Sequence, residues 1–220
     1  MLCAFDFDGT LGNSRFVCYK ALQLYSQQKG LKIPAYSDMD RVFGNPNPPI
    51  IFEEWGDMGG FRQHLLNIYE MTDALICDQP SDAPLYPGIR DLLNDLSKDF
   101  VLTVVTSRAL APIRALMEYH KIGSYFKTIR SDQDIIDRGY RGKPHPDKLN
   151  CVLKEMGFHP EKTAMIGDTS MDMAMAKSAG VKAVGVSWGF NDEATLRDHG
   201  ADEVAKTPET LNQVIRCILA

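Results

Sequence analysis

Short apolar segments alternate with helical patterns along most of this chain, and no other feature of the sequence limits the possible fold as strongly. The apolar segments have the length expected of buried strands. They cover residues 2–7, 100–105, 127–130, 163–166, 181–186 and 203–205. Strands separated by helices form a parallel sheet, with right-handed crossovers that place helices on both faces. The sequence therefore predicts a doubly wound, Rossmann-like α/β core.

One long segment, residues 14–83, does not follow this alternation. It contains helical patterns at about residues 13–30 and 60–77, separated by a run rich in glycine and proline. Because the segment lies between the first strand and the rest of the sheet, we interpret it as an insertion. We expect an all-helical cap of residues 14–83 on a core formed by residues 1–13 and 84–220.

Composition and charge narrow the class of protein. Of the 220 residues, 44% are hydrophobic and 24% charged, which is ordinary for a globular chain that buries a core. A net charge of −5 argues against a nucleic-acid binder, and no apolar run approaches the ~20 residues that span a bilayer. The five cysteines are scattered without a CxxC pair, as in a reducing compartment, so a zinc site is not expected. We expect a cytoplasmic protein without a nucleic-acid, membrane or obligate protein partner.

Polar residues follow several of the predicted strands, at the carboxyl ends where an open parallel sheet binds its ligands. Asp6 and Asp8 follow the first strand, Thr106 the second and Asp168 a later one, while Lys143 lies in a loop. Each alone has an ordinary alternative, as a helix cap for the aspartates and the threonine or as a solvated lysine. Together they place three carboxylates, a hydroxyl and an ammonium group at one edge of the sheet.

This set of groups has a specific chemical use. Three carboxylates at one edge repel one another unless a cation joins them. Oxygen ligands without a cysteine or histidine cluster favour Mg²⁺ over Zn²⁺. Mg²⁺ held by carboxylates, with a lysine and a hydroxyl opposite, suits the oxygens of a phosphoryl group. A carboxylate can also attack phosphorus itself and form an acyl phosphate. The residues therefore indicate Mg²⁺-dependent phosphoryl transfer.

The same residues carry a resemblance to a known family. The segments are Asp6–Leu11 (DFDGTL), Val104–Ser107 (VVTS), Lys143–Pro146 (KPHP) and Gly167–Asp172 (GDTSMD). In order and spacing they resemble the four motifs of the haloacid dehalogenase-like hydrolase superfamily. The expected cap lies between the first and the second motif, as in the phosphoglycolate phosphatase-like branch. The resemblance covers essentially the whole chain, and four ordered motifs are far more specific than one.

The resemblance implies catalytic roles. Asp6 would be the nucleophile that forms an aspartyl phosphate. Asp8 would be the general acid–base that protonates the leaving oxygen and then activates water. Thr106 would donate a hydrogen bond to the phosphoryl group, and Lys143 would balance its charge.

The resemblance also implies where Mg²⁺ binds. The ligands would be the Asp6 carboxylate, the Asp8 backbone carbonyl and Asp168. Asp172 follows Asp168 by four residues and would lie close enough to order a metal-bound water or Lys143. The alternative for Asp172 is an ordinary carboxylate at a helix N-terminus.

Contacts to the rest of the substrate are specified less closely. Ser107 and Arg108 follow the second motif and are candidate substrate ligands beside Thr106 and Lys143. Further candidates lie in the cap, where they would set specificity: Arg41, Asn45, Trp55 and Arg62.

We expect a Mg²⁺-dependent phosphatase, a phosphoric monoester hydrolase that acts on a small phosphorylated metabolite such as phosphoglycolate. Dehalogenation is disfavoured, because dehalogenases lack an acid at the position of Asp8 and need none to release a halide. A phosphosugar mutase of the β-phosphoglucomutase type, a pyrophosphatase and a nucleotidase stay open as alternatives. A non-catalytic regulatory protein is least favoured, since the nucleophile, the acid and the metal ligands are all present.

Overall fold

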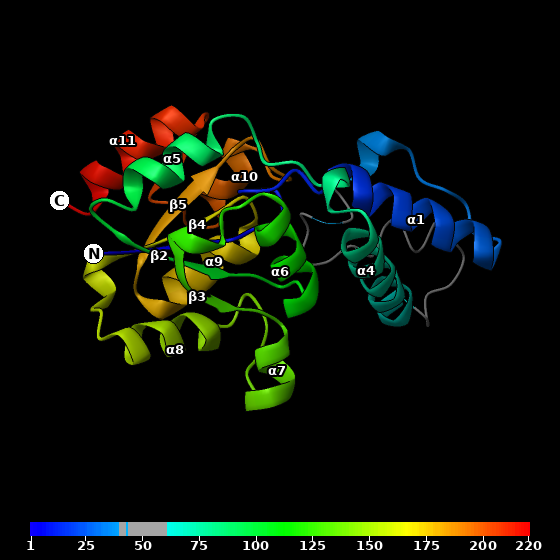
Figure 1. Ribbon diagram of the computed structural model, residues 1–220, viewed down its shortest axis with the longest axis horizontal. Helices are drawn as coiled ribbons and strands as arrows, with labels where there is room; N and C mark the ends of the chain where they lie inside the picture. The colour runs from blue at the N-terminus through cyan, green and yellow to red at the C-terminus, as the bar shows by residue number, and fades with distance from the viewer. Residues whose placement is uncertain (40–42, 44–60) are drawn as a thin grey trace.

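The computed structural model describes residues 1–39, 43 and 61–220, and the described residues form a core around a six-stranded parallel sheet (Figure 1). The strands are β1 (Leu2–Phe5), β2 (Val101–Val105), β3 (Phe126–Arg130), β4 (Thr163–Gly167), β5 (Lys182–Val186) and β6 (Glu203–Ala205). Their order across the sheet is β3-β2-β1-β4-β5-β6, and every neighbouring pair is parallel. The predicted doubly wound α/β core is confirmed.

The first strand is shorter than predicted. The sequence pattern predicts a strand as far as Phe7, but β1 ends at Phe5. The Phe7 carbonyl accepts hydrogen bonds from the backbone amides of Leu11 and Gly12, both at 2.9 Å, and these bonds turn the chain. The Asp6 amide still donates a hydrogen bond to the Ile166 carbonyl of the neighbouring strand β4, so Asp6 lies at the very end of the sheet.

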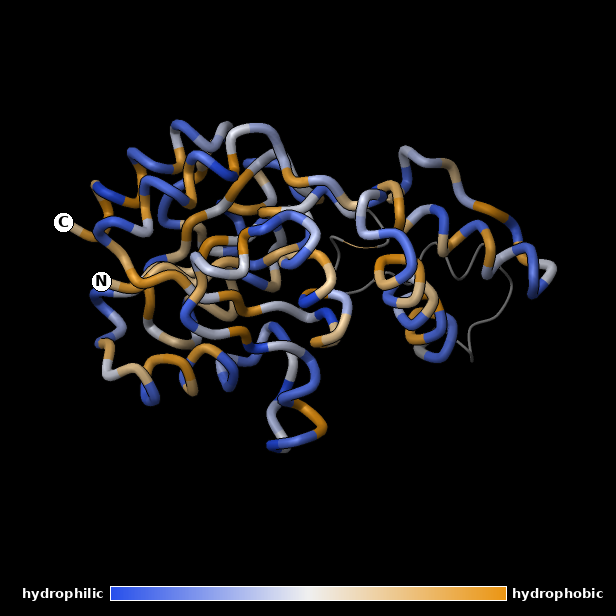
Figure 2. The backbone as a smooth tube through the Cα atoms, in the orientation of Figure 1, coloured by the Kyte–Doolittle hydropathy of each residue, from blue (hydrophilic) through white to orange (hydrophobic). Residues whose placement is uncertain are grey.

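Helices cover both faces of the sheet. One face packs against α5 (Ile89–Leu96), α6 (Leu110–Tyr119) and α11 (Pro208–Ile218), and the other against α8 (Asp147–Met156), α9 (Ser170–Ala179) and α10 (Glu193–Asp198). Because side chains alternate along a strand, Phe5 joins the first apolar cluster and Ala4 the second. In Figure 2 the helices alternate between hydrophilic and hydrophobic residues, as expected when one side of each faces the sheet. A short helix that the sequence pattern did not indicate, α7 (Gln133–Arg138), projects from the core (Figure 1).

The segment 14–83, which we call the cap, is helical in its described part. The helices α1 (Arg15–Lys29) and α4 (Phe61–Asp78) lie side by side beyond the carboxyl ends of the strands (Figure 1). Two 3₁₀ turns, Tyr36–Asp38 and Pro80–Asp82, accompany them. The apolar cluster between the two helices also includes Phe190 from the core, so the cap packs directly against the core.

The chain enters the cap at Leu11–Asn13 and leaves it at Pro84–Tyr86, and these two segments are hydrogen-bonded to each other. The Asn13 amide donates to the Pro84 carbonyl at 2.7 Å, and the Tyr86 amide donates to the Leu11 carbonyl at 3.0 Å. Between them, Gly12 and Leu85 form an antiparallel bridge. The division into a core of residues 1–13 and 84–220 and a cap of residues 14–83 stays a prediction, and it places its joints at these connections.

Part of the cap lies beyond what can be described. The candidate substrate contacts Arg41, Asn45 and Trp55 lie outside the described residues, and so does the side chain of Arg62. Among the described helices, none combines the length and the apolar character needed to cross a membrane.

Candidate active site

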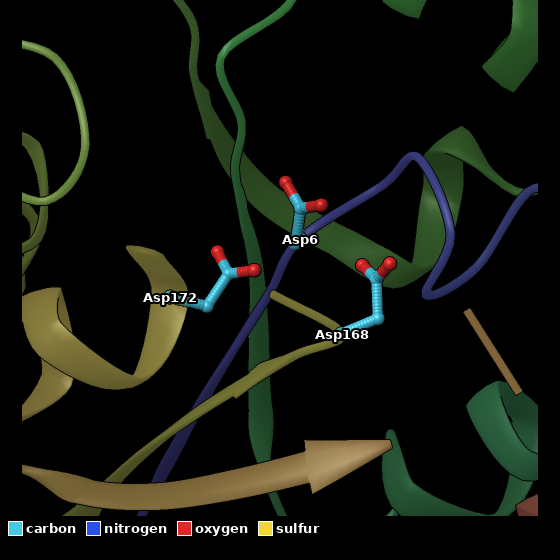
Figure 3. A group of neighbouring side chains, drawn as sticks. All are labelled: Asp6, Asp168 and Asp172. Atoms are coloured by element: carbon cyan, nitrogen blue, oxygen red, sulfur yellow. The ribbon is translucent and has the colours of Figure 1, made fainter. Parts of the chain in front are cut away.

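Three buried carboxylates meet at the carboxyl ends of β1 and β4 (Figure 3). Asp6 directly follows β1, and Asp168 directly follows β4. The two strands are neighbours that pair Phe5 with Ile166, so Asp6, one residue beyond the pair, and Asp168, two residues beyond it, emerge at the same edge. Asp172, in the first turn of α9, completes a group whose oxygens lie within 4.8 Å of one another.

Lys143 connects two of these carboxylates. Its Nζ atom donates to Asp6 Oδ1 and to Asp172 Oδ1, both at 2.6 Å, and the side chain is almost fully buried. Burial alone would lower the pKa of Lys143, but the charges of Asp172 and Asp6 outweigh it and raise that pKa above its usual value. Lys143 therefore stays cationic beside the predicted nucleophile.

Burial makes the carboxylates reluctant to ionise. It raises the pKa of Asp6 to about 7, since the charge of Lys143 offsets only part of the effect and Asp172 and Asp8 add to it. Burial, followed by the charges of Asp6 and Asp172, also raises the pKa of Asp168 well above its usual value. A divalent cation among these oxygens would offset the repulsion, and oxygen-only donors are the ligands that Mg²⁺ prefers. The donor set thus fits the expected metal.

The Asp168 carboxylate is held from two sides. Its Oδ1 atom accepts a hydrogen bond from the Thr10 hydroxyl at 2.9 Å, and its Oδ2 atom accepts one from the Phe190 amide at 2.8 Å. A Cβ atom at Gly9 or at Gly189 would lie within 2.3 Å of this carboxylate, so both close approaches require glycine. The sequence contains Thr10 in its first motif without indicating this role, and a backbone amide such as that of Phe190 leaves no sequence signal at all.

Asp172 contacts both Lys143 and the N-terminus of its own helix. Its Oδ1 atom contacts Lys143, while its Oδ2 atom accepts hydrogen bonds from the Thr169 amide at 3.1 Å and the Thr169 hydroxyl at 2.6 Å. Thr169 is the N-cap residue of α9, so these bonds close a capping box. The helix cap thereby fixes the carboxylate that orients Lys143.

Thr106 follows β2 one residue beyond the level of Asp6. The register pairs Phe5 with Val104, and Thr106 is almost fully buried just beyond this pair. Its hydroxyl accepts a hydrogen bond from the Arg108 amide at 3.2 Å. Ser107, between them in the sequence, is exposed. The structure therefore brings the predicted hydroxyl to the same edge of the sheet as the carboxylates.

Arg108 joins the predicted acid–base to the cap. Its Nε atom contacts Asp8 Oδ2 at 2.6 Å, and its Nη1 atom contacts Asp73 Oδ1 of α4 at 2.5 Å. Its Nη2 atom lies 3.9 Å from the Cys18 sulfur of α1. The other oxygen of Asp8, Oδ1, is buried and has no hydrogen-bond partner among the described residues.

Lys148, which the sequence analysis did not select, holds the backbone of Thr106 from the helix α8. Its Nζ atom donates to the Thr106 carbonyl at 2.6 Å and contacts Asp132 Oδ1 at 2.5 Å, and its side chain is fully buried. In the sequence Lys148 begins a helical pattern, where a lysine is usually a solvated residue. Its role depends on how α8 docks beside β2, which no local pattern shows.

We expect Lys148→Met to destabilise the protein by about 1–3 kcal/mol, because the buried Thr106 carbonyl then loses its donor. Urea unfolding measures the free energy. Lys154→Met, at an exposed position of the same helix, is the matched control and should change stability by less than about 0.5 kcal/mol. Equal effects of the two substitutions would contradict the assigned role of Lys148.

Comparison with known proteins identifies the class to which this fold and site belong. The model of the haloacid dehalogenase-like hydrolase family matches residues 3–186, so the chain belongs to this family. The predicted family and the predicted hydrolase class are confirmed. The fold agrees with that of a haloacid dehalogenase-like family protein from Streptococcus pneumoniae, with a TM-score of 0.81, 24% identity and 97% of each chain covered.

Relatives named as phosphoglycolate phosphatases place the chain near one branch of the family. It is 29% identical over 197 residues to the phosphoglycolate phosphatase of Pseudomonas fluorescens (strain Pf0-1), covering 86% of this chain and 70% of that protein. It is 33% identical over 108 residues to the phosphoglycolate phosphatase of Escherichia coli (strain K12), covering 49% of this chain and 41% of that protein. The second match therefore spans less than half of the relative's length.

Proposed function

We propose that this protein is a Mg²⁺-dependent phosphatase that hydrolyses a small phosphate monoester through an aspartyl phosphate on Asp6. One observation carries the proposal. A buried carboxylate, Asp6, contacts the buried ammonium group of Lys143 and lies two residues before Asp8, whose buried Oδ1 atom has no partner in the described part of the chain. These are a nucleophile, a cation for the phosphoryl oxygens and a proton donor in one place.

In the first step, the Asp6 carboxylate attacks phosphorus and the bond from phosphorus to the ester oxygen breaks. The leaving oxygen takes its proton from Asp8, through the Oδ1 atom that makes no hydrogen bond to any described residue. Lys143 balances the charge of the phosphoryl oxygens, and the Thr106 hydroxyl donates to one of them. The alcohol leaves, and the phosphoryl group stays on Asp6.

In the second step, Asp8 takes a proton from water, and the water oxygen attacks the phosphorus of the aspartyl phosphate. The bond between phosphorus and the Asp6 oxygen breaks, which releases inorganic phosphate and restores the carboxylate. Asp8 thus serves first as acid and then as base, and each turnover leaves it as it began.

The residues that would hold Mg²⁺ are the Asp6 carboxylate, the Asp8 backbone carbonyl and Asp168. When bound, the ion would screen the repulsion between the nucleophile and the phosphoryl oxygens. Asp172 acts through Lys143, which it contacts at 2.6 Å, and so serves as a positioning residue. Ser107 and Arg108 are the further substrate ligands of this proposal.

The proposal is tested by measuring phosphate release from p-nitrophenyl phosphate and from a panel of phosphorylated metabolites that includes phosphoglycolate. We expect Mg²⁺-dependent hydrolysis, with phosphoglycolate among the better substrates, as the names of the relatives suggest. A parallel preparation of Asp6→Asn controls for contaminating phosphatases. Hydrolysis of none of the esters would overturn the proposal, and conversion of a sugar phosphate to its isomer would replace it with a mutase.

A further inference from the structure

The Arg108 side chain lies between the predicted proton donor and the cap. Its guanidinium contacts Asp8 through Nε and Asp73 through Nη1, and its side chain is only 5% exposed. A buried guanidinium keeps its charge and holds a fixed fork geometry, so it recognises carboxylates specifically. The carboxyl groups of Asp8 and Asp73 therefore share this one cation.

The two carboxyl partners of Arg108 lie in different parts of the fold. Asp8 lies in the turn after β1, whereas Asp73 belongs to α4 of the cap, and their side chains are similarly exposed, at 18% and 23%. Asp73 also accepts a hydrogen bond from the Ala109 amide, which water can replace at this partly exposed position. Because Asp8 is required for the proposed proton transfer, Asp73 is the partner that a ligand would replace.

The position of the ester oxygen relates these contacts to the substrate. In the proposed reaction this oxygen takes its proton from Asp8, the residue that Arg108 contacts through Nε. Atoms attached to the ester oxygen therefore lie next to the guanidinium. An anionic group one or two carbons away would reach the N–H groups that Asp73 now occupies.

We propose that the Arg108–Asp73 pair selects phosphate esters of short hydroxy acids, with the carboxylate of the substrate replacing Asp73 on Arg108. The inference rests on the proposed phosphatase function and names the substrate class of the same site. Asp73 keeps the guanidinium paired in the free enzyme. An ester with an uncharged leaving group does not replace it and gains no binding energy from Arg108.

The test compares two substrates that differ only in the charged group, phosphoglycolate and ethyl phosphate. The measured quantity is the ratio of their kcat/KM values, in which any effect on the shared chemistry of Asp6 and Asp8 cancels. We expect Arg108→Gln to lower the ratio by about tenfold or more, because one charged contact of ~1.4 kcal/mol is lost. We expect Asp73→Asn to raise the ratio, because the competing carboxylate is gone.

Glu70→Gln is the matched control, since Glu70 is an exposed carboxylate on the same helix. It should leave the ratio unchanged, which separates replacement at Arg108 from a general change in the charge of α4. Circular dichroism establishes that each variant is folded. If Arg108→Gln did not fold, Asp73→Asn would decide alone.

Each outcome is distinct. A ratio that Asp73→Asn leaves unchanged or lowers would overturn the inference and make the pair a structural contact between cap and core. In that case, hydrolysis of both esters by the native enzyme would leave the proposed phosphatase function standing. Hydrolysis of no ester at all would overturn the proposed function, and this inference with it.

Discussion

Asp6→Asn is expected to lower kcat for phosphate release by at least about a thousandfold, a loss of ~4 kcal/mol or more in transition-state stabilisation. The amide is nearly the same size as the carboxylate but cannot attack phosphorus. The fold should persist, because Lys143 keeps its second contact, to Asp172 at 2.6 Å. Steady-state kinetics with p-nitrophenyl phosphate measures kcat, and circular dichroism monitors the fold.

Asp78→Asn, at an exposed position near the end of α4, is the control and should retain full activity. If Asp6→Asn kept more than about a thousandth of the native kcat, the assignment of Asp6 as the nucleophile would be wrong. Trapping adds a second measurement. Phosphate from a labelled substrate should attach covalently to the native protein during turnover and not to Asp6→Asn.

Removal of the metal is expected to stop turnover entirely. Excess chelator should abolish phosphate release, Mg²⁺ should restore it, and Ca²⁺ should inhibit, because its larger and looser coordination misplaces the attacking carboxylate.

The affinity for Mg²⁺ should also depend on pH. Because the pKa of Asp6 is raised to about 7 in the metal-free protein, a proton must leave before the carboxylate can bind the ion.

The direction of this pH dependence follows from the raised pKa of Asp6. Above pH 7 Asp6 is ionised and free to bind, whereas below pH 7 the proton competes and the affinity falls by up to about tenfold per pH unit. Titration calorimetry of Mg²⁺ into the metal-free protein at several pH values measures this slope. Full activity in excess chelator would contradict the metal assignment. An affinity for Mg²⁺ that did not change between about pH 5 and about pH 7 would contradict the role of Asp6 as a ligand.

Much of the site could be predicted because it depends on strand order alone. Asp6 and Asp168 each follow an apolar run, and in a parallel sheet such residues emerge at one edge. The contacts of Lys148 and Asp73 could not be predicted in this way. They join residues that are 42 and 35 positions apart in the sequence, and they depend on how α8 and α4 dock.

The fold shows the same limit at a local scale. Long periodic helices such as Pro208–Ile218 follow from the sequence pattern, whereas the six-residue helix α7 does not. The helix α7 buries almost no apolar side chain, and its Ile136 is 78% exposed. Hydrophobic periodicity therefore has little to report there. The early end of β1 likewise comes from the hydrogen bonds that the Phe7 carbonyl accepts from the Leu11 and Gly12 amides, which hydropathy does not reveal.

The paired connections at Leu11–Asn13 and Pro84–Tyr86 have an evolutionary consequence. Since the two ends of the intervening segment meet within hydrogen-bonding distance, its length and sequence place no demand on the order or register of the sheet. Insertions, deletions or replacement between these points would leave the residues of the proposed phosphoryl transfer in place, because Asp6, Asp8, Thr106, Lys143 and Asp168 all lie outside them. A chain built in this way could therefore change the molecules that it recognises by exchanging one continuous stretch of gene, without any change in the remainder.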